Sequence, residues 1–364
     1  MAGSAAHAPG AGSGAVLPGS APPEAGGLGA APPRDAAGAS GTALPGPAPH
    51  VPPPDRQLLR ARLFLRAALP VLKVIVEDDQ AMNRRFTGVH AVVQFRVKDG
   101  AGTPGTAPGG FAGPEPFTPA AQGTGGRAAP GRPHGTPAAS TADPTGAQPL
   151  AAHVIIDDGV VRVEPGVYDH GAHGETAKPT ITFTFADVYK MNDFFAGKTV
   201  LPGIKGLSRP GLLAKVVVLL LALKLLLPSA QPKDADKRRL KVKMTLYMIT
   251  TALSQYNKAG DPEMVRWTSR QPERIYQMSV EPEGIAAYLR VRAGLSKAGR
   301  GFYERRRPFV HLRFHGVDGA LAVMNKEVGF VDGVGRGFVT VEGSPEYAAN
   351  FNDFMQRVQA LLLG

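Results

Sequence analysis

Residues 179–188 read PTITFTFADV and contain the most regular strand pattern of the chain. Apolar and polar residues alternate with a period of two, which is typical of a strand with one buried face. We expect Ile181, Phe183 and Phe185 to face a core and the intervening threonines to face away from it. Asp187 then begins a short predicted helix that ends at Gly197.

This stretch aligns without gaps on a second one, PFVHLRFHGV, at residues 308–317. Upstream, VVQFRV at residues 92–97 aligns on IYQMSV at residues 275–280. Both halves show the same order of a helix, strands, a short helix and an apolar C-terminal helix. Such self-similarity predicts two copies of one α+β unit, each with helices on one sheet face.

Glycine and proline are abundant, with 45 and 34 residues, but they concentrate in residues 1–54 and 100–148. These two stretches cannot bury enough apolar surface to offset the entropy of ordering, so we predict that both are disordered. Because loop-closure entropy grows only slowly with length, we interpret 100–148 as an insertion inside a domain. The predicted domains are residues 55–228 and 240–364, with a linker at 229–239.

The remaining pattern predicts further elements in both halves. A helix begins after Asp55, a strand spans 89–97 and a hairpin spans 153–163. In the C-terminal half we expect a helix at 240–256 and an amphipathic helix at 347–363. Strands are expected at residues 275–280, 286–291 and 309–314.

The composition excludes several classes of site. The chain has no cysteine, which rules out disulfides, thiolate zinc sites and cysteine nucleophiles. Its formal net charge is +11, but the basic residues are dispersed and no stacking-aromatic pattern accompanies them. We therefore expect no nucleic-acid partner, and we leave open transient contact with an anionic membrane surface. Without a secretory signal pattern, a cytoplasmic protein is expected.

Groups that could perform chemistry are sparse. Asp169, His170 and His173 lie in a glycine-rich stretch, and His311 and His315 flank an arginine on a predicted strand. The sequence shows no phosphate-binding lysine loop, no nucleophile elbow and no zinc-protease motif. We expect no catalysis, metal or cofactor, and a cryptic enzyme remains an alternative.

Residues 211–227, GLLAKVVVLLLALKLLL, form the most apolar run. The run is shorter than the roughly 20 residues of a bilayer span. Lys215 and Lys224 project from opposite faces of a helix, since they are nine residues apart. A helix packed in a domain is the leading interpretation, and membrane docking through this helix is the alternative.

Taken together, residues 178–228 resemble a sterol carrier protein domain of the type-two family. The resemblance lies in the strand at 179–185, the short helix at 187–195, Gly197-Lys198, a small-residue turn and the apolar helix. Residues 308–364 are similar, and GFVTVEG at 337–343 resembles the family's closing strand. In the first copy Pro202 and Gly203 interrupt the corresponding segment, 199–204, which makes the first pocket the less certain one.

The resemblance implies a roughly five-stranded sheet covered on one face by helices, with an apolar tunnel between the two layers. We therefore expect non-catalytic binding or transfer of a sterol, a fatty acyl chain or a similar apolar ligand. The alternative left open is that the same side chains close into a dry core. The candidate ligand-binding residues are Phe95, Ile181, Phe183, Phe185, Phe194, Leu219, Leu223, Met278, Leu312, Phe314, Met324, Phe351, Phe354 and Met355.

Overall fold

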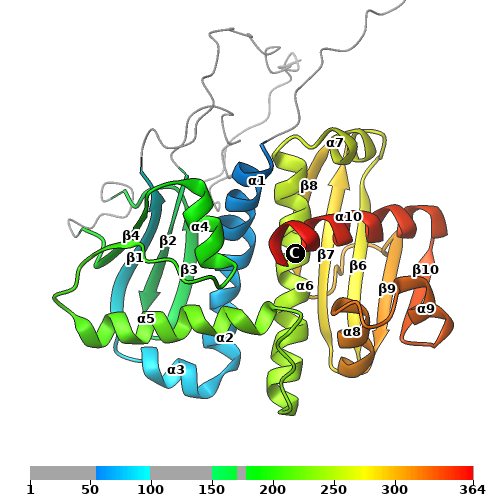
Figure 1. Ribbon diagram of the computed structural model, residues 1–364. Helices are drawn as coiled ribbons and strands as arrows, with labels where there is room; N and C mark the ends of the chain where they lie inside the picture. The colour runs from blue at the N-terminus through cyan, green and yellow to red at the C-terminus, as the bar shows by residue number, and fades with distance from the viewer. Residues whose placement is uncertain (1–54, 99–149, 170–177, 364) are drawn as a thin grey trace, which may run out of the picture. The chain divides into compact units, whose positions relative to one another are not determined.

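The computed structural model describes residues 55–98, 150–169 and 178–363 (Figure 1). The predicted tail at 1–54 and the predicted insertion at 100–148 lie outside the described residues. So do His170 and His173 of the glycine-rich stretch.

The alternating stretch forms β4 (Ile181–Phe185) at the point where the pattern predicts it. Ile181, Phe183 and Phe185 are at most 2% exposed, and the threonines between them are half-buried. The strand pairs in parallel with β1 (His90–Val97) and antiparallel with β5 (Gly203–Lys205). One apolar face therefore points into a core while the other carries hydroxyls.

The first sheet has the strand order β3-β2-β1-β4-β5. Its outer hairpin joins β2 (Ala151–Asp157) to β3 (Val160–Pro165). The two turn residues, Asp158 and Gly159, have φ angles of 46° and 78°. Two successive positive φ angles belong to the type I′ turn, whose twist matches that of the flanking strands.

The second sheet consists of β6 (Arg274–Glu281), β7 (Ile285–Arg292), β8 (Leu295–Arg300), β9 (Val310–His315) and β10 (Val339–Gly343). Its order, β10-β9-β6-β7-β8, is that of the first sheet read from the other edge. The central pair β6 and β9 is again parallel, and the other neighbours are antiparallel. The protein is thus an α+β structure with two five-stranded mixed sheets.

The parallel pairs also share their register. Val97 lies opposite Phe185 in the first sheet, and Val280 lies opposite Phe314 in the second. These are the residue pairs that the alignment of 92–97 on 275–280 and of 179–188 on 308–317 makes equivalent. The two segments of each half therefore meet in the same way, although they are far apart in the sequence.

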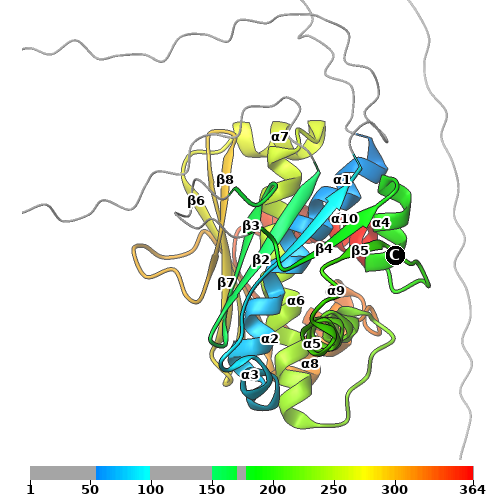
Figure 2. The same ribbon diagram turned by 90° about the vertical axis from the view of Figure 1, so that its left-hand side faces the viewer.

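Two long helical segments pack side by side (Figures 1 and 2). The first runs through α1 (Arg56–Leu63), a π-helical turn (Phe64–Ala68), a 3-10 turn (Leu69–Val71) and α2 (Leu72–Asp78). Its winding changes next to Pro70, which has no N–H to donate to the preceding turn.

The second segment, α6 (Ala235–Lys258), begins earlier than predicted, so the last five residues of the expected linker 229–239 are helical. Lys243 of α6 forms an ion pair of 2.6 Å with Asp78 of α2.

The other helices are distributed over both halves. In the first half these are α3 (Gln80–Phe86), α4 (Val188–Phe195) and α5 (Pro210–Ala222), which continues as a 3-10 turn (Leu223–Leu226). In the second half they are α7 (Pro262–Ser269), α8 (Gly316–Met324), α9 (Phe330–Gly335) and α10 (Pro345–Leu363). The sequence pattern did not predict α7, α9 or β8; α9 contains two glycines and β8 lacks alternating apolar residues, so neither shows a period.

The bounds of the first closing strand were also predicted wrongly. The closing strand of the first sheet, β5, lies at Gly203–Lys205 and not at residues 199–204. Its next residue, Gly206, has φ of +93°, and a Cβ there would lie 2.0 Å from the Thr180 carbonyl oxygen. Gly343 at the end of β10 has φ of +99°, and its Cβ would lie 2.0 Å from the Phe309 carbonyl oxygen. Each glycine therefore lets the closing strand leave the sheet against the backbone of its neighbour.

Replacing Gly343 by Ala is expected to destabilise the protein by about 1–3 kcal/mol more than replacing Gly316 by Ala. Gly316 also has a positive φ, +75°, but a Cβ there meets no atom within 4 Å. The control thus measures only the conformational cost, roughly 1–2 kcal/mol, without the collision. Urea denaturation of both variants measures the difference, and equal losses would show that the backbone contact is unimportant.

Candidate functional site

The helix that covers each closing strand is placed differently in the two halves. Helix α10 packs directly on β9 and β10, whereas α5 packs mainly on α2 and α3. Helix α10 buries seven side chains, while α5 buries only Val216 and Leu219. A strongly apolar helix is therefore held off its own sheet in the first half.

The side chains beneath the two helices also differ in size. In the second half, the ring centroid of Phe351 lies 5.0 Å from that of Tyr276, and Trp267 and Phe354 lie 5.3 Å apart. These rings fill the space between α10 and its sheet. Counted from the proline that begins each helix, Val216 and Leu219 of α5 take the places of Phe351 and Phe354.

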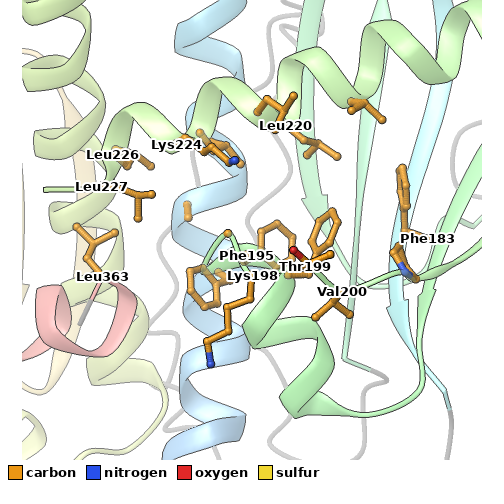
Figure 3. A pocket seen from close by; sticks show the side chains of 18 of the residues that line it. Phe183, Phe195, Lys198, Thr199, Val200, Leu220, Lys224, Leu226, Leu227 and Leu363 are labelled. Carbon is orange, nitrogen blue, oxygen red and sulfur yellow. The ribbon is translucent and has the colours of Figure 1, made fainter. Parts of the chain in front are cut away.

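A cavity of about 370 Å³ lies beneath α5 (Figure 3). Figure 3 shows Leu220 and Lys224 on its helical side, with Phe195, Thr199 and Val200 on the opposite side. Leu226, Leu227 and the C-terminal Leu363 close one end. The remaining wall residues come from the π-helical turn, the sheet, α4 and its following loop, α5, and α6: Phe64, Ala68, Phe183, Phe194, Gly197, Lys198, Leu201, Pro202, Ile204, Val217, Leu221, Leu223 and Met248.

Aromatic rings stack on the sheet side of the cavity. Phe183 stacks on Phe95 with the ring centroids 5.1 Å apart, and Phe195 stacks on Phe64 at 5.4 Å. Phe194 contacts Phe185 at 5.3 Å. Such offset and tilted contacts between rings add to the stabilisation that burial gives to this side of the cavity.

The rim of the cavity exposes large apolar side chains. Leu201 is 92% exposed, Leu221 is 50% exposed and Val217 is 40% exposed. All three line the cavity as well. Apolar side chains are thus exposed to solvent around the opening of the cavity. This arrangement is expected for the entrance of a site for an apolar molecule.

Polar side chains in the wall are few. They are Lys198, Lys224 and Thr199, and the wall contains no carboxylate. Lys198 is paired with Asp193 at 2.7 Å, and its neighbour Gly197 has φ of +82° at the end of α4. The site therefore offers apolar contact and positive charge but no acid–base pair for catalysis.

A buried lysine anchors the turn that follows α5. Lys241 of α6 is 2% exposed, and its Nζ donates to the carbonyl oxygens of Leu227 at 3.0 Å and Ala230 at 2.5 Å. Burial lowers the pKa of Lys241, and Glu327 opposes that shift. These charge-assisted hydrogen bonds hold the chain at the end of the cavity.

Of the fourteen candidates from the sequence, Phe183, Phe194 and Leu223 line the cavity. Four others are buried in the hydrophobic core without lining the cavity: Phe95, Ile181, Phe185 and Leu219. The seven from the second half are buried in the core of that half and do not line this cavity: Met278, Leu312, Phe314, Met324, Phe351, Phe354 and Met355. The cavity thus lies in the first half, whose pocket was the less certain of the two in the sequence analysis.

Sequence reasoning missed the loop at residues 197–202 and both contributions from the C-terminal half, Met248 and Leu363. The loop has no period, and contacts between distant helices leave no local signal. The position of Lys224 inside an apolar run was the one available hint, since a charge there must reach solvent or a ligand.

The outer face of the second sheet carries a separate polar cluster. The Ser279 hydroxyl donates to Glu281 Oε1 at 3.1 Å and lies 2.8 Å from His311 Nε2. Glu342 Oε2 is 3.9 Å from His311 Nδ1. Ser279 is 0% exposed, so a substrate cannot reach its oxygen in this arrangement. The cluster is a packed network, in which burial and the Arg313 guanidinium lower the pKa of His311 against the opposing carboxylates.

This network predicts a pH dependence of stability. Because the pKa of His311 is lower in the folded protein than its ordinary value of 6.5, protonation favours the unfolded chain. The contribution of the neutral imidazole is complete above about pH 6.5 and is lost as the pH falls toward the folded pKa. Urea denaturation between pH 7.5 and 5 is expected to show this loss, and His311→Gln to reduce it.

His315→Gln controls for the removal of an imidazole from the same strand, where the side chain is exposed. An unchanged pH profile in His311→Gln would show that the buried imidazole does not contribute to the loss.

The residues that the structure describes contain no group of three or more histidine, aspartate or glutamate side chains placed to hold a metal ion. None of their helices combines the length and apolarity needed to cross a bilayer. Residues 211–227 form a helix that ends at Ala222, followed by the 3-10 turn.

Comparison with known proteins finds no matching family model and no matching curated protein. Among solved structures, palmitated SCP2L2 from Aedes aegypti is 18% identical, covering 29% of this chain and 90% of that one, with a TM-score of 0.23. Sterol Carrier Protein 2 Like 2 from the same organism is 17% identical over 31% of this chain and 97% of that one, with a TM-score of 0.23. The sec-alkylsulfatase Pisa1 from Pseudomonas sp. is 14% identical, covering 43% of this chain and 29% of that one, with a TM-score of 0.20.

Proposed function

We propose that this protein binds an apolar, lipid-like molecule without catalysis, in the cavity beneath α5. The observation that supports this most directly is the cavity of about 370 Å³, whose wall is aliphatic and aromatic apart from two lysines and a threonine. Its size falls in the range of about 300–1,000 Å³ that is usual for small-molecule sites.

Burial alone supplies the driving force for such binding. Each Å² of apolar ligand surface removed from water contributes about 25 cal/mol. An alkyl chain placed between Phe183 and Leu220 would contact apolar atoms on both sides. The exposed Leu201, Val217 and Leu221 surround the entrance, so the ligand would meet an apolar surface before it enters.

We further propose that the chain consists of two sterol-carrier-type units, residues 55–228 and 240–364, of which the first holds the ligand. Three shared features support two copies of one fold. They are the strand order, the register of the parallel pair, and the equivalent positions of Gly206 and Gly343. In the second unit, aromatic side chains occupy the space that the cavity takes in the first.

The proposal is tested by filling the cavity. Leu220→Trp adds a large ring from α5 into a space lined by apolar atoms. We expect at least about a tenfold loss of binding of a fluorescent alkyl probe, with thermal stability unchanged or slightly raised, because cavity filling is commonly stabilising. Native mass spectrometry of the purified wild-type protein is expected to show retained acyl or sterol material, which the variant lacks.

Val331→Trp is the matched control, because Val331 is 81% exposed on α9 and lies outside the cavity wall. Wild-type protein that retains no lipid and binds no alkyl probe would contradict the proposed function. Equal binding by wild-type protein and Leu220→Trp would instead place the ligand elsewhere.

A further inference from the structure

We infer that the second half of the chain completes the cavity of the first half, and that Leu363 of α10 limits the length of the apolar ligand that fits. The inference rests on the proposed function, because it concerns selection among ligands of the same cavity. The helix that covers the cavity within the first half is α5, and Leu363 comes from the corresponding helix of the other half. The site is therefore a composite of both halves.

The second half contributes two side chains to the wall of the cavity, Met248 of α6 and Leu363 of α10. Figure 3 shows Leu363 at the same end of the cavity as Leu227, whereas Phe183 lies at the other end. Leu220 lies between the two ends, on the side of α5 (Figure 3). An alkyl chain that runs beneath Leu220 away from Phe183 therefore ends against Leu363.

Buried side chains fix the last turn of α10. Val358 and Leu362 are buried in the hydrophobic core. The side-chain amide of Gln359, which is buried as well, donates a hydrogen bond of 2.6 Å to the carbonyl oxygen of Met324. Leu363 follows these residues directly on the helix and is itself half-buried. Its side chain therefore has a defined position at the end of the cavity.

Helix α6 connects this end of the cavity to the first half. It contacts α10 and also the π-helical turn of the first half, from which Phe64 and Ala68 line the cavity. Its buried Lys241 donates to the carbonyl oxygen of Leu227 at 3.0 Å, and its buried Met248 lines the cavity directly. Because α10 and the π-helical turn both pack on α6, Leu363 is held in place relative to the wall that the first half provides.

A closed end limits an alkyl chain by its length. Each buried methylene raises the affinity about fourfold, because it removes apolar surface from water. Once the chain reaches the end wall, a further methylene must stay in solvent or displace packed side chains, so the affinity no longer rises. A homologous series therefore shows a break at the chain length that fills the cavity. The size of the side chain at position 363 sets the position of that break.

Unbranched 1-alkanols of about 8 to 18 carbons provide such a series, since only the number of methylenes changes. Their affinities for the full-length protein are measured by displacement of a fluorescent alkyl probe. Wild-type affinity is expected to rise about fourfold per methylene up to the break. Leu363→Ala removes three carbon atoms from the wall and should move the break by about two to three carbons toward longer chains. Leu363→Trp should move it toward shorter chains, because the larger ring occupies the end of the cavity.

Leu361→Ala is the matched control, because Leu361 is also a half-buried leucine in the last turn of α10 but does not line the cavity. It should leave the break where the wild-type protein has it. An equal shift in Leu361→Ala would overturn the inference and indicate a general loosening of α10.

An unchanged break in both variants of Leu363 would also overturn the inference and leave the proposed function standing. Leu363→Trp keeps the test decisive if the alanine variant does not fold. Failure of every alkanol to bind the wild-type protein would overturn the proposed function itself.

Discussion

The distance at which α5 is held from its sheet determines the rest of the site. A helix with this many leucines and valines is expected to lie flat on the nearest apolar surface, as α10 does on β9 and β10. Helix α5 instead packs on α2 and α3, and Lys241 fixes the turn at its far end by hydrogen bonds to Leu227 and Ala230. The sheet face beneath it is kept in place by stacked phenylalanines, so the layers stay apart and a cavity of about 370 Å³ lies between them.

The two halves show how one strand arrangement can be either filled or hollow. Their sheets have the same order and the same register, and each closing strand ends at a glycine against a backbone carbonyl. Tyr276, Phe351 and Phe354 fill the second half, while Val93, Val216 and Leu219 occupy the corresponding positions of the first. Rings there would leave little room for a ligand, since protein interiors pack to near-crystalline density. The second half also contributes Met248 and Leu363 to the wall of the cavity.

The few polar side chains discussed above lie either in a packed network or at the rim of the cavity. The cluster of Ser279, His311 and Glu342 is on the outer sheet face, and its serine is buried, so it stabilises the second sheet rather than meeting a ligand. In the cavity, by contrast, charge is confined to the rim, where water can solvate it. Apolar side chains form almost all of the remaining wall.

The sequence by itself predicted most of the strands, though not β8 or the bounds of β5, and it predicted which face of β4 is buried and how segments of the two halves align. These follow from a period of two and from self-similarity, which are local properties of the chain. Of its fourteen candidate residues, three line the cavity, namely Phe183, Phe194 and Leu223. Only the tertiary structure decided that the hollow is in the first half, that the closing strand begins at Gly203, and that Lys224 stands at the rim. A cavity is the volume that stays empty when helices and side chains from distant parts of the chain have packed together. Its position therefore cannot be predicted from the pattern of any single segment.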